Sequence, residues 1–208
     1  MMTNSTAPSE GELLQRMVAG DDQAFAMVYR RHQGAVYRFA LLMSGSAAIA
    51  EDVTQEAFMV LIREAHLYNP ARGTLTAYLY GIARNYVLRR LKRDRFFVSL
   101  IRDAEDSDEI PLAKLIANDD PFGDFTRNEM ARLVRQTVLS LPPRYREVVV
   151  LCDFQELSYA DAATVLGCAL GTVSSRLHRG HALLLERLRA VSKLDPGTPD
   201  AQLLRCFT

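Results

Sequence analysis

The stretch that decides the fold is LSYADAATVLGCALGTVSSRLHRGHALLLERL, residues 157–188. Ser158 can cap a helix start, and Asp161 stands at the capping-box position three residues later. Gly167 can end that helix, because glycine readily takes the left-handed conformation found just past a helix. A second helix follows within about four residues, a connection typical of a helix-turn-helix. The stretch therefore predicts a short helix, a tight turn and a longer helix.

The second helix has two different faces. Its apolar stripe contains Val173, Leu177, Gly180, Leu184 and Leu188, at the spacing of a buried helix face. Small hydroxyl residues and arginines fall mostly outside that stripe: Thr172, Ser174, Ser175, Arg176 and Arg179. Such residues near the start of a second helix are typical of a major-groove reader. An ordinary packed helix pair with a solvated basic face fits the same pattern.

Charge is distributed unevenly, although the 208-residue chain has a formal net charge of zero. Residues 84–95 are strongly basic, residues 102–124 are acidic, and residues 176–193 are basic again. Two positive segments separated by a negative one indicate two polyanion-binding units, joined by a segment that repels DNA.

Helical periodicity runs through nearly the whole chain and predicts an all-α fold of two small helical domains. Helices are expected at residues 11–19, 23–43, 48–67, 74–93 and 126–139, and another begins at Pro142 and Pro143. The predicted organisation is a disordered lead (1–10), a first domain (11–95), a flexible acidic linker (96–125), a helix-turn-helix domain (126–191) and a tail (192–208).

Location follows from what the sequence lacks. No apolar run is long enough to cross a bilayer, and the N-terminus does not resemble a signal peptide. The three cysteines, Cys152, Cys168 and Cys206, are odd in number and widely spaced. We therefore expect a reduced, cytoplasmic protein without membrane insertion.

Two surfaces of the first domain can each be interpreted in two ways. The acidic face of the helix at 48–67 is either solvated or a docking site for a basic protein partner. The aromatic and basic residues after the loop at 68–73 suit stacking against unpaired bases, or they are core residues. His32 lies on an apolar helix side and is given no function.

Two segments together resemble one family. AEDVTQEAFMVLIREAHLY (50–68), followed by GTLTAYLYGIARNYVLRRLKR (73–93), resembles region 2 of extracytoplasmic-function (ECF) sigma factors of the sigma-70 family. LPPRYREVVVLCDFQELSYADAATVLGCALGTVSSRLHRGHALLLERL (141–188) resembles their region 4. The resemblance implies a factor that binds core RNA polymerase and directs it to promoters.

The resemblance also implies roles for individual residues. It assigns docking on the β′ clamp helices of the polymerase to Asp52, Gln55 and Glu56, and it names the β subunit as a further contact. It assigns minus-10 capture and DNA backbone contacts to Asn69, Arg72, Thr74, Tyr78, Arg84, Asn85, Arg89, Arg90 and Arg93. It assigns minus-35 reading to Thr172, Ser174, Ser175, Arg176 and Arg179. An anti-sigma factor is the usual partner of the family.

The chain departs from the family pattern at several positions. Tyr78 stands where the family usually has tryptophan, and Arg89 stands where it often has an acid. A tyrosine can still stack on a base, but these changes affect the expected minus-10 preference. The tail is longer than the minimal family pattern, and Cys206 has no assigned role.

Three rival interpretations come from other classes of protein. A stand-alone helix-turn-helix regulator would leave the acidic face and the aromatic segment unexplained. A zinc enzyme would depend on Cys168, His178 and His181, which lack a second closely spaced ligand pair. A helical interaction protein would leave both basic blocks merely solvated. We therefore expect no enzyme activity, no metal and no cofactor.

Overall fold

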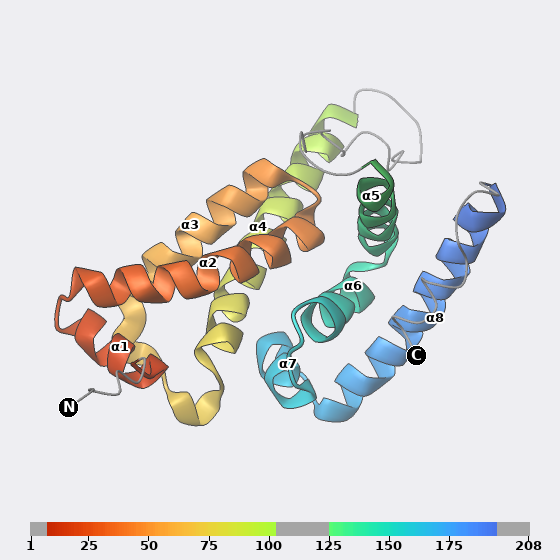
Figure 1. Cartoon of the computed structure of the whole chain (residues 1–208). Coiled ribbons are helices and arrows are strands. Elements are labelled where there is room, and N and C mark those ends of the chain that lie inside the picture. Colours follow the sequence, from red (N-terminus) through yellow and green to blue (C-terminus); the bar gives the residue numbers. More distant parts are fainter. Residues whose placement is uncertain (1–7, 103–124, 195–208) are drawn as a thin grey trace.

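The computed structural model describes residues 8–102 and 125–194, and every regular element in those ranges is helical (Figure 1). The prediction of an all-α fold is confirmed. Within the described residues, no helix is long and apolar enough to cross a membrane.

The first domain contains α1 (Glu10–Val18), α2 (Asp22–Ser44), α3 (Ala47–Glu64) and α4 (Leu75–Arg102). Short 3-10 turns, η1 (Ala65–Leu67) and η2 (Pro70–Arg72), form the connection from α3 to α4. Fully buried side chains such as Phe39, Leu61 and Leu79 fill the space between these helices. Burial of one apolar face on each helix is what holds the bundle together.

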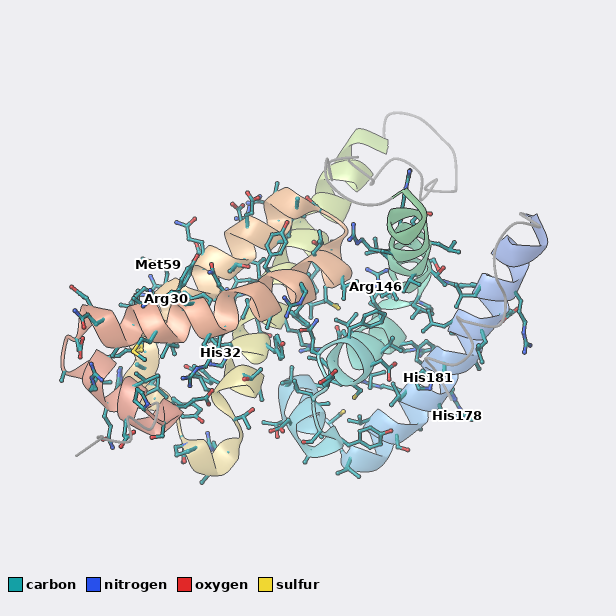
Figure 2. The ribbon with its side chains drawn as sticks, viewed as in Figure 1. Arg30, His32, Met59, Arg146, His178 and His181 are labelled. Carbon is teal, nitrogen blue, oxygen red and sulfur yellow. The ribbon has the colours of Figure 1, made fainter. Side chains whose placement is uncertain are left out.

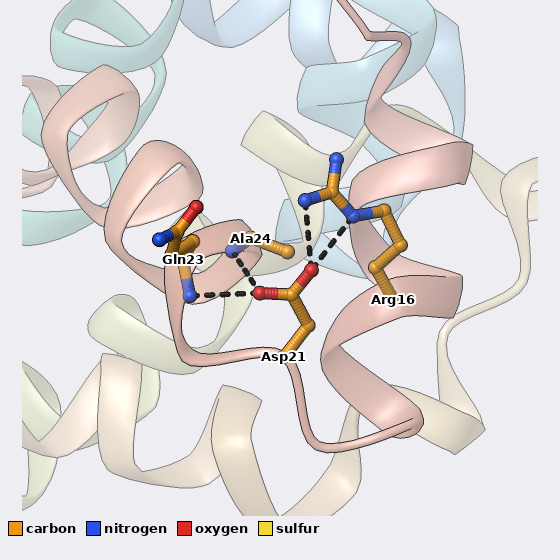
Figure 3. A network of polar contacts seen from close by, with 4 residues as sticks. All are labelled: Arg16, Asp21, Gln23 and Ala24. Atoms are coloured by element: carbon orange, nitrogen blue, oxygen red, sulfur yellow. Dashed lines mark hydrogen bonds and ion pairs between the residues drawn. The ribbon is translucent and has the colours of Figure 1, made fainter.

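Asp21 fixes the corner between α1 and α2 (Figure 3). Its Oδ1 accepts hydrogen bonds from the backbone N–H groups of Gln23 (2.9 Å) and Ala24 (3.2 Å), so it caps α2. Its Oδ2 pairs with Arg16 of α1 at 2.7 Å. The hydrogen bond from Arg16, with those of the capped backbone, lowers the pKa of Asp21.

The second domain contains α5 (Phe125–Ser140), α6 (Pro143–Val149), a π-helical turn η4 (Val150–Phe154), α7 (Tyr159–Leu166) and α8 (Leu170–Leu194). Ser158 caps α7: its Oγ accepts from the N–H of Asp161 at 3.1 Å and donates to the Asp161 carboxylate at 2.7 Å. Gly167 ends α7 with φ +62°. The predicted helix-turn-helix is therefore confirmed as α7 and α8.

The two domains pack against each other. Figure 1 shows α7 beside α4, and these two helices are in contact. Helix α2 also contacts α5 and η4. Arg146 of α6 lies between the domains and donates to the carbonyls of Met43 (2.9 Å) and Leu141 (3.0 Å) (Figure 2). Its bond to Met43 joins the end of α2 to the second domain.

Several helices extend beyond their predicted ends. Helix α4 continues to Arg102 rather than ending near residue 93, so it enters the predicted linker at 96–125. The sequence contains no glycine or proline between Gly81 and Pro111 to break it. Helix α8 runs to Leu194, past the predicted domain end at 191, and α1 begins at Glu10. The rest of the linker (103–124), residues 1–7 of the lead, and residues 195–208 of the tail lie outside the described residues.

Candidate nucleic-acid interface

The polar face of α8 is directed away from the domain core. Ser174, Ser175 and Arg179 are exposed, while Arg176 and Thr172 are half-buried. On the opposite side, Val173 is 0% exposed and Leu177 is 4% exposed. The structure thus brings the five predicted major-groove residues to the start of one helix and leaves most of them accessible.

A second cationic group beside this face was missed by the sequence analysis. Arg144 of α6 lies over the ring of Tyr145, with its guanidinium carbon 4.7 Å from the ring centroid. A hydrogen bond from Arg179, together with the charge of Arg144, lowers the pKa of Tyr145. Arg144 and Arg179 therefore form one positive cluster from two helices. Only the tertiary packing of α6 on α8 brings them together, so spacing along the chain gave no signal.

A pocket of about 360 Å³ lies at the start of α4. Among the predicted minus-10 residues, those that line it are Asn69, Arg72, Thr74, Tyr78 and Asn85. The rings of Tyr68 and Tyr78 pack edge to face in its wall, with centroids 5.6 Å apart. Such a pocket offers aromatic surface and polar groups together, which is what an extruded base needs.

Local hydrogen bonds give the pocket its shape. The Asn69 side chain accepts from the N–H of Ala71 at 2.9 Å, and Thr74 caps α4 by accepting from the N–H of Ala77 at 3.2 Å. Tyr68 donates its hydroxyl to the carbonyl of Gly73 at 3.0 Å. Burial raises the pKa of both Tyr68 and Tyr78. Tyr68 begins the loop that the resemblance assigns to base capture, but it is not among the residues named individually for that role.

The remaining basic residues of α4 do not share this pocket. Arg84 pairs with Glu147 of α6 at 2.9 Å, and Arg90 pairs with Asp52 of α3 at 3.0 Å. The Arg89 guanidinium lies 5.4 Å from the ring centroid of Tyr86, and Arg93 is exposed. The predicted minus-10 set is therefore divided between a pocket and several separate positions along α4.

The predicted docking residues lie on α3. Asp52 and Gln55 are exposed, and Glu56 is half-buried. Beside them is a groove of about 560 Å³ between α2 and α3. Its apolar lining includes Tyr29 and Phe58, whose ring centroids are 4.8 Å apart.

The rim of this groove carries unusually exposed apolar side chains. Met59 is 45% exposed and Ile62 is 50% exposed. Figure 2 shows Met59 on the side of the first domain that faces away from the second domain. Exposed apolar residues beside acids mark a surface suited to a protein partner.

Two of the histidines, His32 and His181, pair with acidic side chains. His32 of α2 is 6% exposed; its Nε2 lies 3.1 Å from Glu10 and its Nδ1 lies 3.5 Å from Thr76. Burial lowers the pKa of His32, partly opposed by Glu10. His181 pairs with Asp153 at 2.8 Å, while His178 is exposed on α8 (Figure 2). Across residues 8–102 and 125–194, no three His, Cys, Asp or Glu side chains are grouped to hold a metal ion.

Comparison with known protein families gives two matches. Residues 28–97 match Sigma-70 region 2, and residues 131–184 match Sigma-70, region 4. The first match covers most of the residues that line the groove and the pocket, and the second covers most of α5 to α8.

Curated relatives give the same result over most of the chain. The chain is 34% identical to the ECF RNA polymerase sigma factor SigM of Mycobacterium tuberculosis, over 86% of this chain and 85% of the relative. It is 36% identical to SigE of Mycolicibacterium smegmatis over 76% of this chain, a match that spans 59% of that relative's length. It is 29% identical to SigW of Bacillus subtilis, over 85% of this chain and 95% of the relative.

Solved structures share the fold. The structure of CnrH in complex with the cytosolic domain of CnrY superposes with a TM-score of 0.63 at 26% identity, covering 86% of this chain and 96% of that one. The sigma factor RpoE in complex with the anti-sigma factor NepR, from Bartonella quintana, gives 0.62 at 24% identity, covering 79% and 96%.

Proposed function

The chain belongs to the extracytoplasmic-function sigma factors of the sigma-70 family, and from this premise we propose how its residues bring RNA polymerase to a promoter. As a transcription initiation factor, it binds core polymerase and directs it to specific promoter DNA. Such a factor would work in the cytoplasm, together with the polymerase. The main observation behind the proposal is the pocket at the start of α4. The accessible polar face of α8 in the same chain supports it.

The pocket would hold a non-template base after it leaves the duplex. Unstacking costs a few kcal/mol per step, and stacking on an aromatic side chain returns about 1–3 kcal/mol per base. Tyr78 supplies a half-buried ring, and Asn69, Thr74 and Asn85 supply hydrogen-bonding groups around it. Capture therefore offsets melting without nucleotide hydrolysis.

The backbone next to the captured base would be held by the basic side of α4. Arg89 and Arg93 are exposed on α4, and Arg72 is exposed on η2 just before it. Each phosphate that such a side chain neutralises releases counterions. Arg84 and Arg90 would join them after leaving their present acidic partners.

The start of α8 would read the minus-35 element. Ser174, Ser175 and Arg179 are exposed along the helix, and arginine can form paired hydrogen bonds with guanine in the major groove. Arg176 and Thr172 lie at the border of the same face. Arg144 lies beside Arg179 and suits a phosphate contact.

The acidic face of α3 would dock on the β′ clamp helices. Asp52, Gln55 and Glu56 offer charge, and the adjoining groove accepts apolar side chains from the same partner. Because two solved relatives are complexes, one with an anti-sigma factor and one with the cytosolic domain of CnrY, we also propose an anti-sigma partner.

Core-dependent promoter binding tests this proposal against a stand-alone regulator. A mobility-shift assay would compare promoter duplex with the chain alone, with core polymerase alone and with both. We expect a stable complex only with both. Tight, sequence-specific binding by the chain alone would overturn the proposal in favour of the stand-alone regulator.

A further inference from the structure

One of the predicted major-groove residues is tied to a second helix. Arg179 is exposed on α8, and its side chain donates a hydrogen bond to the hydroxyl of Tyr145 on α6. Helices α6 and α8 pack against each other (Figure 1). A guanidinium has five donors in one rigid plane. A bond to Tyr145 therefore restricts how the plane is turned and still leaves donors for DNA.

Tyr145 is suited to hold this guanidinium because its own ring is fixed. The residue is 8% exposed and lies in the first turn of α6. The guanidinium carbon of Arg144 is 4.7 Å from the ring centroid, a distance typical of a cation–π contact. The phenol oxygen is therefore presented to Arg179 from a ring that is buried on one side and covered on another.

The backbone that carries Arg179 is also held close to α6. A Cβ on Gly180, the next residue, would lie 3.7 Å from the Cβ of Tyr145 and 3.6 Å from its carbonyl oxygen. His181 follows Gly180 and pairs with Asp153 of η4 at 2.8 Å. Three successive residues of α8 thus contact α6 or η4, so this part of the helix has little freedom to rotate.

The phenol oxygen also lets two positive side chains lie close together. The hydrogen bond from Arg179 lowers the pKa of Tyr145, and the charge of Arg144 lowers it further, while burial opposes the shift. Positive groups around a phenol oxygen are expected to act in this direction, because they stabilise negative charge on it. The hydroxyl therefore serves as an acceptor between the two arginines.

We propose that Tyr145 is a positioning residue for minus-35 reading: its hydroxyl holds part of the Arg179 guanidinium, so that the remaining donors are presented to a guanine in the major groove. The inference rests on the proposed function, because it requires α8 to read the minus-35 element. Guanine is the expected base, since its O6 and N7 accept two hydrogen bonds from one guanidinium. Tyr145 acts through Arg179 and does not touch the base.

Ordering the arginine before DNA arrives should affect both affinity and discrimination. Immobilising a long side chain on binding weakens a binding constant by about two- to tenfold. With Tyr145 in place, part of that ordering has already occurred during folding. A paired contact with guanine also requires one orientation of the guanidinium, whereas a freely moving arginine can reach other bases or phosphates. Loss of the hydroxyl should therefore relax the base preference.

The test uses the full chain assembled with core polymerase. The DNA is one promoter identified by start-site mapping, together with every single base-pair substitution across its minus-35 and minus-10 elements. Sequencing of the DNA bound in a mobility-shift competition gives the relative affinity for each substitution. The proteins compared are wild type, Tyr145→Phe, Arg179→Ala and the double variant. Tyr145→Phe keeps the ring that Arg144 covers and removes only the hydroxyl, and urea denaturation checks the stability of each variant.

Wild-type holoenzyme should prefer guanine at one or more minus-35 positions, and Arg179→Ala should abolish that preference. Tyr145→Phe should reduce the preference at the same positions by about two- to tenfold. Preferences at the minus-10 element are the internal control and should be unchanged. The double variant should match Arg179→Ala, because the hydroxyl acts only through that arginine.

Four results would overturn the inference. Unchanged minus-35 preferences in Tyr145→Phe would remove the positioning role, and equal weakening at every position would indicate a general structural effect instead. A loss in the double variant beyond that of Arg179→Ala would show that Tyr145 acts independently. A preference that depends on Arg179 but favours a base other than guanine would exclude the paired contact. Failure of the proposed function looks different: Arg179→Ala itself would leave all minus-35 preferences unchanged, and the inference would fall with it.

Discussion

Gly180 offers the sharpest test of the packing that positions the recognition helix. A Cβ added there would lie 2.7 Å from Cγ2 of Val149 and 3.6 Å from the carbonyl oxygen of Tyr145. Val149 is 0% exposed and β-branched, so it has little freedom to move aside. Overpacking of this kind costs about 1–3 kcal/mol, whereas replacing a helical glycine by alanine gains about 1 kcal/mol. We expect Gly180→Ala to destabilise the protein by about 1 kcal/mol.

Gly171 of the same helix is the matched control. A Cβ on Gly171 meets no other atom within 4 Å, and the residue is exposed. Gly171→Ala should therefore stabilise the protein by about 0.5 kcal/mol through backbone entropy. Urea denaturation followed by circular dichroism would measure both variants. Equal stabilisation by the two alanines would refute the close contact of α8 with α6.

Three further predictions concern the first domain. Asp52→Arg should weaken binding to core polymerase about tenfold or more in a pull-down titration, since repulsion replaces attraction at the docking face, while Glu186→Arg leaves it unchanged; full binding by Asp52→Arg contradicts the assignment. Tyr78→Ala should make promoter opening less favourable by about 1–3 kcal/mol in a permanganate-reactivity assay, because a stacking surface for the base is lost. Tyr78→Phe keeps the aromatic face and should retain most of the opening. Equal loss of opening in both variants would show that stacking on the ring is not the cause. His32 is buried with a lowered pKa, so the folded state binds fewer protons than the unfolded state, whose histidine pKa is about 6.5. The free energy of unfolding should therefore fall as the pH drops from 7 to 5.5. In thermal melts, His32→Gln should make stability less dependent on pH over this range. Parallel stability profiles for the wild type and the variant would contradict this role of His32.

Much of the fold could be predicted because local chemistry fixes it. Ser158 and Gly167 act only on their immediate neighbours, so their identities mark where α7 begins and ends. The stripe from Val173 to Leu188 is buried because its helical spacing puts every member on one side of α8. The predicted end of α4 near residue 93 is too early, because no glycine or proline breaks the helix before Arg102.

The arrangement of the site could not be predicted in the same way. Arg84 and Glu147 are 63 residues apart in sequence, and neither residue type reveals that the two meet. Composition correctly marked Arg84 as part of a basic segment, but its partner depends on how α6 packs against α4. Arg144 was missed for the same reason, since its position beside Arg179 follows from the packing of α6 on α8.

As a sigma factor of the ECF type, this chain directs core RNA polymerase to promoters. In vitro transcription across a genomic DNA library, with start sites mapped for core polymerase with and without the chain, tests it most directly. Transcripts that begin at defined sites only when the chain is present, and that are lost with Arg176→Ala and Arg179→Ala, are the predicted result. Identical start sites with and without the chain would contradict the claim.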